Sequence, residues 1–482
     1  MATEPKIKSV EESTMTKKNV SEELADKIFK IREEKTVQES DVEEIKDLIE
    51  KGADVNAYGN EYGTSLLHCA VSKDISPSRL MERVVKMIIK AGFQVNTTNC
   101  IGEPSLFYAV ETGNGAFVKQ ILDAGADVNL QSQTGCTALY VAVKMRNIKI
   151  AKQLIKNGAD LNTQDRIDRD TPIHLAVKNN DVRMVKLLLK SKAKADIKDY
   201  YCYNPLLTAV CNNNKAIVKL LVKNRAKIEI ASGFNCTPLF IAVDLNKKAI
   251  TKVLLEKGAK VNKLGGLEGN TPLHAAVKNR NLAIAKLLVD AKANLKKKNW
   301  VGMTPLHMAA ESGQCKLAKL LVQNGADPSI KDKEGKTPLH LAIENSREKL
   351  TGYLLGIGAD EYIPYKNRYK LLYLAAHKGN QRIIKVLLSK GYDLTKRYSR
   401  GVTALNILFF KGHADILIDF FKNAEIINRH IGYINSYLDI LKTYHPEAYD
   451  KFNHHIERLL GEETLNSADK RKSLATGYEH DI

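Results

Sequence analysis

The stretch Gly302–Lys336 reads GMTPLHMAAESGQCKLAKLLVQNGADPSIKDKEGK and contains the signals of one complete structural unit. Thr304 is a good helix N-cap, and Pro305 follows at the first helical position, where its missing N–H has no consequence. Small and apolar residues then predict a short helix that ends near Gly313. The apolar stripe in residues 317–322 predicts a second helix.

The second helix ends where Gly325 supplies a residue suited to the left-handed region. The polar run from 327 to 336 turns the chain back, and the pattern begins again at Thr337, 33 residues after Thr304. A helix pair this short cannot bury its own apolar face, so it needs neighbours of the same kind.

The same helix start recurs along most of the chain. Its successive positions are Ser65, Pro104, Thr137, Thr171, Asn204, Thr237, Thr271, Thr304, Thr337, Lys370 and Thr403. The steps between them are 39, 33, 34, 33, 33, 34, 33, 33, 33 and 33 residues. A fixed period of this length is the sequence signature of a repeat solenoid.

Short motifs within the repeats resemble the ankyrin-repeat signature. They are TPIHLA (171–176), TPLHAA (271–276), TPLHMA (304–309) and TPLHLA (337–342), together with GADVN or GADLN at repeat ends. The resemblance covers roughly residues 40–424. It implies an all-α fold with short β-hairpin turns: an ankyrin-repeat α-solenoid of about eleven full repeats plus helical caps, with a concave binding face. It does not identify a partner.

The domain boundaries follow from this pattern. We expect a disordered lead at 1–20, an N-terminal helical cap at 21–57, the ankyrin array at 58–424, C-terminal capping helices at 425–460 and a disordered polar tail at 461–482. Ser21 is interpreted as the N-cap of the first helix. Two helices at about 432–443 and 446–460 are expected in the C-terminal cap.

Some repeats depart from the pattern. Ser65, Pro104, Asn204 and Lys370 replace the capping threonine, so we expect less rigid first helices there. Three repeats have a basic residue where the helix-ending glycine is expected: Lys192, Arg225 and Lys292. A non-glycine residue in the left-handed region costs about 1 kcal/mol, part of which a cation at a helix C-terminus recovers.

Composition narrows the setting and the chemistry. The polar N-terminus is no signal peptide, and no apolar run is long enough to span a bilayer. Seven cysteines at irregular spacing indicate a reducing compartment, so we expect the cytoplasm, with the nucleus also open. No phosphate-binding loop, nucleophile elbow or HExxH helix is present, so we expect no enzyme, no catalytic residues, no metal and no cofactor.

The repeat histidines could suggest a metal or catalytic site. They are His68, His174, His274, His307 and His340, and they recur with the period of the repeat. No Asp or Cys recurs beside them at metal-ligand spacing. In ankyrin repeats this histidine bonds locally and ties neighbouring units together, so the resemblance implies a structural role. The pair His454-His455 is interpreted as solvated.

The finger tips carry the clearest binding signal. By resemblance, residues two to four places before each first helix project there and commonly contact partners. Four consecutive fingers carry large side chains: Tyr200, Tyr201, Tyr203, Phe234, Leu267, Trp300, Val301 and Met303. We interpret them as one partner-binding stripe with Trp300 as anchor, because hot spots favour Trp and Tyr. Alternatively, the rings fold back onto their own hairpins. Lys144, Met145, Lys178 and Lys278 are placed on the adjoining helix face.

The net charge of +19 is concentrated in one block. Residues 178–298 contain 25 Lys/Arg and 8 Asp/Glu, whereas residues 1–50 contain 9 and 14. The block could serve solubility, an acidic protein partner, or nucleic acid or an anionic membrane. Lysine outnumbers arginine by 57 to 17, which argues against nucleic acid, because arginine makes the bidentate contacts. Lysines such as Lys186 and Lys219 fit a solvated convex side.

The leading hypothesis is a monomeric, non-catalytic scaffold that binds a protein partner through the concave face and fingers of residues 133–345. A partner with an acidic surface is one option. Nucleic acid and membrane are not expected as partners. The alternative is a sequestering regulator or ubiquitin-ligase-type substrate adaptor that uses residues 425–482, although no LPxEI-like segment is present. A third hypothesis is electrostatic binding of nucleic acid or anionic membrane by the block 178–298.

Overall fold

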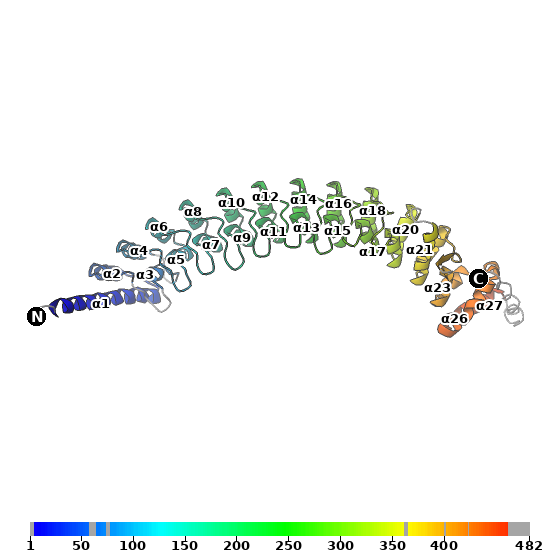
Figure 1. The fold of residues 1–482 in the computed structure, drawn as a ribbon, viewed down its shortest axis with the longest axis horizontal. Coiled ribbons are helices and arrows are strands. Elements are labelled where there is room, and N and C mark those ends of the chain that lie inside the picture. Colours follow the sequence, from blue (N-terminus) through cyan, green and yellow to red (C-terminus); the bar gives the residue numbers. More distant parts are fainter. Residues whose placement is uncertain are drawn as a thin grey trace. The chain divides into compact units, whose positions relative to one another are not determined.

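Helices make up nearly all of the regular structure in the computed structural model of this protein (Figure 1). The structure describes residues 4–56, 64–73, 78–360, 365–399, 402–422 and 424–460. It divides into two compact units, Met1–Lys260 and Val261–Ile482, which are described separately below. In both units the helices come in short pairs, and the all-α repeat architecture predicted from the sequence is confirmed.

The first unit begins with α1 (Glu4–Glu34) and α2 (Glu39–Glu50). The first helices of its repeats are α3 (Leu66–Ala70), α5 (Ser105–Glu111), α7 (Ala138–Lys144), α9 (Pro172–Lys178), α11 (Pro205–Cys211) and α13 (Pro238–Asp244). The second helices are α4 (Arg79–Lys90), α6 (Gly115–Asp123), α8 (Ile148–Lys156), α10 (Val182–Lys190), α12 (Lys215–Lys223) and α14 (Lys248–Glu256). Figure 1 shows the second helices side by side along one edge of this unit.

The second unit repeats the arrangement. Its first helices are α15 (Pro272–Lys278), α17 (Pro305–Glu311), α19 (Pro338–Glu344), α21 (Tyr365–His377) and α23 (Ala404–Phe410). Its second helices are α16 (Leu282–Asp290), α18 (Cys315–Gln323), α20 (Glu348–Gly356), α22 (Gln381–Ser389) and α24 (Ala414–Phe420), followed by α25 (Ala424–Arg429), α26 (Ile431–Tyr444) and α27 (Pro446–Leu460). An antiparallel hairpin of β1 (Arg397–Ser399) and β2 (Val402–Thr403) precedes α23.

Ten of the eleven predicted helix starts are N-caps in the structure. Ser65 and Asn204 accept a hydrogen bond from the third helical N–H, as threonine does, so of the four departures only Pro104 is a cap without a side-chain acceptor. The prediction at Lys370 was wrong, because α21 begins at Tyr365. Position 370 carries neither a capping hydroxyl nor a following proline, so nothing marks a helix start there.

The repeat histidine joins neighbouring repeats, as the resemblance implied. In the second unit, Nδ1 of His274 lies 2.7 Å from the Thr271 hydroxyl, and Nε2 lies 2.9 Å from the carbonyl oxygen of Met303 in the next repeat. Because a carbonyl only accepts, Nε2 carries the proton and the ring is neutral. His307 makes the same pair of bonds to Thr304 and Lys336. This histidine therefore completes a capping box and an inter-repeat tie at once.

The three basic residues expected in the left-handed region are there. Lys192, Arg225 and Lys292 have φ values of +70°, +65° and +62°. Each follows a second helix whose apolar face is buried in its repeat, as with Val185 and Leu188 of α10. Tertiary packing therefore holds the backbone in a conformation that these residues disfavour.

The N-terminal prediction was wrong on two points. Residues 4–20 are not a disordered lead but the first part of α1, which runs to Glu34. No glycine or proline follows Pro5 before Gly52. Extending an existing helix is far easier than starting one, so the polar residues continue the helix. Ser21 is therefore not an N-cap. It is buried in the middle of α1, and its hydroxyl accepts a 2.8 Å hydrogen bond from the Asp54 N–H.

The C-terminal end has its own aromatic core. Phe409 packs against Phe421 and Phe452, with ring centroids 6.3 and 5.5 Å away. Helices α26 and α27 match the two predicted helices, whereas α25 was not predicted. His455 is half-buried, 3.0 Å from the Phe421 carbonyl oxygen, so it is not a solvated residue as predicted. The predicted polar tail, residues 461–482, lies outside the described residues.

Candidate interaction surfaces

The hairpin fingers of the first unit are fixed to one another by backbone hydrogen bonds. The Gln133 N–H donates to the Ile101 carbonyl over 3.1 Å, and the Tyr200 N–H donates to the Asp168 carbonyl over 2.8 Å. Arg166 makes the corresponding bond to Thr134, also over 2.8 Å. The four fingers from that of Ile101 to that of Tyr200 are therefore held in register rather than free to move independently.

Glycine at a finger tip permits this close approach. Gly135 has φ +79°, and a Cβ added there would lie 2.9 Å from the Arg166 backbone nitrogen. At this finger a side chain would have to displace the next one. Other fingers of the unit have Arg169, Cys202 or Asn235 at the same position, also with positive φ, so the left-handed backbone is common to these tips and glycine is not.

Three of the predicted aromatic residues project from the fingers of the first unit. Tyr200, Tyr201 and Phe234 are each about two thirds exposed (64–67%). The rings of Tyr200 and Tyr201 contact edge to face, with centroids 5.4 Å apart. Tyr203 is half-buried, and its carbonyl oxygen lies 3.2 Å from Nε2 of His174. Tyr203 is thus less open to a partner than the other three, whose exposure argues against the fold-back alternative.

Sequence reasoning missed two members of this surface. Ile101 and Ile167 are exposed on earlier fingers of the same unit. They lie three and four places before the helix starts at Pro104 and Thr171, so the rule that selected Tyr200 also selects them. The prediction covered only the four middle fingers. We call Ile101, Ile167, Tyr200, Tyr201 and Phe234 the apolar finger row of the first unit.

The second unit has its own exposed apolar group. Leu267 and Trp300 project from consecutive fingers, 80% and 57% exposed, and Val301 is exposed beside Trp300. The backbone N–H of Trp300 donates a hydrogen bond to the Glu268 carbonyl oxygen over 3.0 Å. Its indole packs directly on Gly269, where an added Cβ would lie 2.4 Å from two ring atoms. Trp300 is therefore held in place while one side of its ring remains open to solvent.

The remaining predicted residues differ in their surroundings. Met303, in the second unit, is half-buried and its carbonyl accepts the His274 bond described above. Lys144 and Met145 are exposed at the end of α7 in the first unit. By contrast, Lys178 lies 2.6 Å from Asp170, and Lys278 lies 3.2 Å from Glu268. Each of these two lysines ties the end of a first helix to its own finger.

Burial changes the proton affinity of several of these groups. Desolvation lowers the pKa of His274 to about 4, although its bond to the Met303 carbonyl opposes the change. Desolvation also raises the pKa of Asp170 to about 6, against the effect of its ion pair with Lys178. Both groups are almost completely buried. Because solvent and partners do not reach His274 and Asp170, we interpret both groups as structural: His274 joins neighbouring repeats, and Asp170 joins a finger to its helix.

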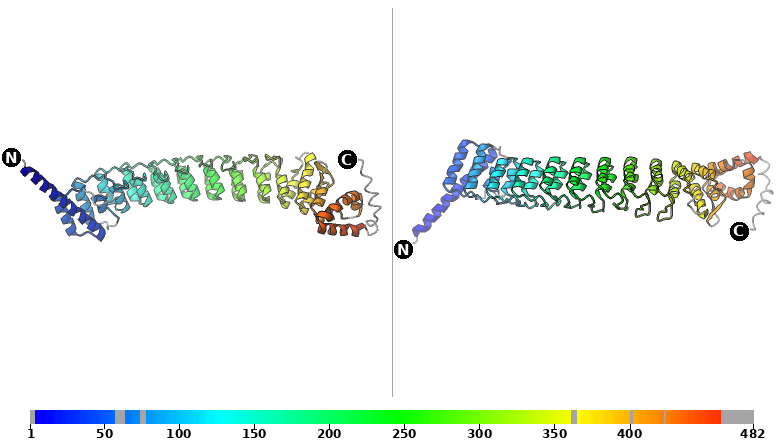
Figure 2. Two further views of the ribbon diagram at one scale, coloured as in Figure 1. Left: turned by 60° about the horizontal axis from the view of Figure 1, so that its bottom comes forward. Right: turned by 90° about the horizontal axis from the view of Figure 1, so that it is seen from above.

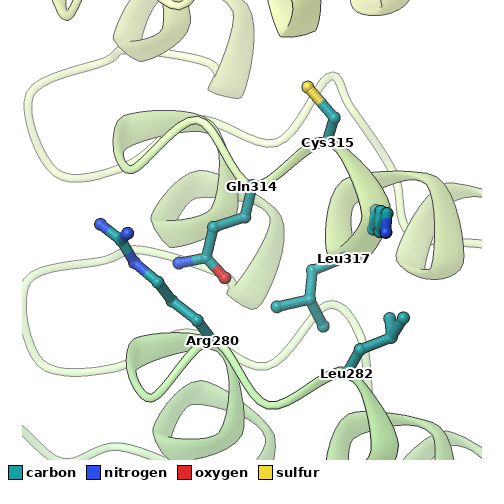
Figure 3. Close-up of a pocket in the computed structure, with 6 residues that line it drawn as sticks. Arg280, Leu282, Gln314, Cys315 and Leu317 are labelled. Carbon is teal, nitrogen blue, oxygen red and sulfur yellow. The ribbon is translucent and has the colours of Figure 1, made fainter.

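One shallow depression lies in the second unit between the turns that precede α16 and α18 (Figure 3). Its lining residues are Arg280, Leu282, Gln314, Cys315, Lys316 and Leu317. Figure 3 shows the Cys315 thiol pointing away from the other side chains. The lining includes no histidine or carboxylate that could activate a thiol nucleophile.

The described residues contain neither a candidate metal site nor a candidate membrane-spanning helix. No three His, Cys, Asp or Glu side chains there come together in a group that could hold a metal ion. Nor is any helix in the described part of the chain both long enough and apolar enough to span a bilayer.

Comparison with known proteins identifies the repeats. A family model described as ankyrin repeats (3 copies) matches residues 78–165, 162–232, 226–299 and 290–364. No curated protein matches. Among solved structures 574 chains match, including the crystal structure of the ankyrin repeat domain of Bcl-3, described as a unique member of the IkappaB protein family. That structure is 29% identical and covers 43% of this chain and 94% of its own, with a TM-score of 0.41.

Proposed function

The chain belongs to the ankyrin-repeat family, and from that premise we propose that it is a non-catalytic scaffold that binds a protein partner through its hairpin fingers. Ankyrin repeats generally serve as protein–protein interaction modules. The apolar finger row of the first unit is the main contact surface. Leu267, Trp300 and Val301 form a further contact surface on the second unit.

One observation carries this proposal: large apolar side chains are exposed on fingers that are themselves rigid. Exposed apolar surface costs about 25 cal/mol per Å² relative to burial, so a contiguous exposed group typically marks an interaction site. The backbone bond from Tyr200 to Asp168 fixes the finger before any partner arrives. A partner then loses little conformational entropy on the scaffold side when it covers these rings.

The test is quantitative affinity purification with the full chain. The variant combines Tyr201→Ala, Phe234→Ala and Trp300→Ala, which removes three exposed rings without touching the buried core. We expect the main partner to be lost and the helical circular-dichroism signal to remain. The matched control is Ile357→Ala, because Ile357 is also an exposed large apolar residue (39%) but follows α20 and belongs to neither candidate surface. Undiminished recovery with the triple variant would refute the proposal.

A second candidate function is the adaptor that recruits another protein through its C-terminal helices. The observation that favours it is the pair Phe410 and Tyr444, both exposed in the second unit. Nε2 of His445 lies 3.0 Å from the Phe410 carbonyl oxygen, so the two aromatic residues belong to adjoining segments. Deleting this region would uncover Phe409, whose ring packs on Phe452, so a deletion cannot separate binding from folding.

Substitution provides the cleaner test of the adaptor function. In Phe410→Ala/Tyr444→Ala, an adaptor loses a set of partners that the finger variant retains. If the same partners are recovered with and without these two rings, the adaptor function is excluded.

A further inference from the structure

The second helices of the first unit carry an unusual concentration of exposed cations. On α8, α10 and α12, each helix has three basic residues and no carboxylate. Together with two lysines of α14 they form what we call the basic array: Lys149, Lys152, Lys156, Arg183, Lys186, Lys190, Lys215, Lys219, Lys223, Lys248 and Lys252. All eleven side chains are exposed.

The array is a continuous field rather than scattered surface charge. Within each helix the cations are three or four residues apart, which places them on one face. The helices α8, α10, α12 and α14 contact one another in sequence, and Figures 1 and 2 show them side by side. With neighbouring helix axes 8–10 Å apart, the field is about 27 Å long, and with 1.5 Å per residue it is about 11 Å wide.

Nothing within the chain's described residues balances this field. Of the eleven cations, only Lys252 has a carboxylate within 4.0 Å, Glu256 at 3.9 Å. Like charges at this spacing destabilise a helix. The second helices of the other unit carry fewer cations: α16 has one cation and one carboxylate, α18 has two cations and no carboxylate, and both cations of α22 are paired, Arg382 with Glu348 and Lys385 with Asp419. The array is therefore a local feature and not a general property of the repeat.

We propose that the basic array binds the phosphate backbone of a double-stranded nucleic acid. A duplex carries one negative charge per about 1.7 Å of axis, so about 16 charges lie along 27 Å and about half of them face one side. An extended acidic peptide presents alternate side chains to one side, which gives about four charges over the same length. Eleven cations match the duplex in charge density and greatly exceed the peptide.

The apolar composition of this face supports the same occupant. On the described helices α8, α10, α12 and α14, Val182 is the sole large apolar side chain that is exposed. Protein interfaces favour aromatic and arginine anchors, of which the array contains Arg183 alone; inserted apolar side chains strengthen membrane binding, and single strands stack on aromatic rings. The scarcity of arginine disfavours base reading but not backbone contact, because lysine binds phosphate as a point charge. This proposal therefore replaces the expectation, drawn from the excess of lysine over arginine, that nucleic acid is not a partner.

The test measures anisotropy of a labelled 20-base-pair DNA duplex with the full chain between 50 and 200 mM salt. If about five phosphates are neutralised, log K should fall with log salt with a slope of about −4.5. Lys152→Glu/Lys186→Glu/Lys219→Glu should weaken binding at least about 30-fold at 100 mM salt and flatten the slope by about 3. The corresponding triple Gln variant, with good helix formers at exposed sites, guards against a folding artefact.

The matched control applies the same charge change outside the array: Lys46→Glu, Lys86→Glu and Lys90→Glu. All three positions are exposed on α2 and α4, which α6 separates from α8. This variant should lose less than about 3-fold, because charges more than a Debye length of about 10 Å from the bound phosphates are largely screened at 100 mM salt. Equal losses in both triples, a flat salt response, or no duplex binding at 50 mM salt would overturn the proposal. So would tighter array-dependent binding to phosphatidylserine vesicles or to polyglutamate.

Discussion

Replacing Gly269 by Ala tests how Trp300 is held. A Cβ at Gly269 would lie 2.4–2.5 Å from three indole atoms, whereas carbon atoms in contact are about 3.5–4.0 Å apart. The indole must therefore move by about 1 Å or more. In addition, Gly269 has φ +62°, where an alanine costs about 1–2 kcal/mol. We expect the substitution to lower the free energy of unfolding by about 2–3 kcal/mol, including the lost ring contact.

Gly335→Ala is the matched control in the same unit. Gly335 has φ +78°, but a Cβ there would meet no atom within 4 Å. Gly335→Ala should lower the free energy of unfolding by about 1–2 kcal/mol, the backbone contribution alone. The difference between the two variants isolates the contact between the indole and the finger.

Fluorescence reports the movement directly, because the chain contains a single tryptophan. In Gly269→Ala the emission should shift to the red and acrylamide quenching should rise, whereas Gly335→Ala should leave both unchanged. Urea unfolding followed by circular dichroism supplies the stabilities. Identical emission and quenching in wild type and Gly269→Ala would show that Trp300 does not pack on this glycine, and would remove the argument that the anchor is preorganised.

Two further predictions concern stability. Desolvation lowers the pKa of His274 and of His340 to about 4, from about 6.5 in an unfolded chain, so protons bind preferentially to the unfolded state. Stability should be constant above about pH 6.5 and fall towards pH 4, by at most about 3 kcal/mol per histidine. Urea midpoints at pH 7.5 and 4.5 measure this, and a His274→Gln variant with undiminished pH dependence would contradict it. Lys192→Gly should raise stability by about 1 kcal/mol, because φ there is +70°. Lys186→Gly, in the middle of α10, should lower it by a similar amount, and calorimetry showing the same sign for both would exclude the backbone argument.

Local signals were strong enough to predict most of the fold. Thr304 and Pro305 specify the start of α17 through atoms within one turn, and Gly325 specifies the end of α18 through its own backbone freedom. Because these causes act over a few residues, they can be recognised in one repeat and then counted along the chain. The helix start at Thr403 was predicted correctly because it has a local capping signal. Lys370 lacks such a signal, and the predicted start of α21 was wrong.

The N-terminal error has the opposite origin. The absence of apolar periodicity before Ser21 suggested disorder, but periodicity reports burial and not helicity. A helix nucleated by the packed part of α1 extends through polar residues at little cost. The hydrogen bond from Asp54 to Ser21 spans 33 residues, so no local pattern could have indicated it.

For the candidate surfaces, too, some features follow from the sequence and others only from the tertiary structure. The sequence by itself determined the repeat, its helix boundaries and the finger positions of Tyr200, Phe234 and Trp300, since each depends on spacing from a helix start. Only the tertiary structure decided which of these side chains remain exposed: Tyr203 turns inward, and Trp300 rests on a glycine of the preceding finger. Likewise, lysines of the same repeat differ in their pairing. Lys178 forms an ion pair with Asp170, whereas Lys186 lies among cations that have no carboxylate partner. Such contacts depend on how the finger folds against its own helix and, for Trp300 and Gly269, on the stacking of repeats, and no local pattern indicates either.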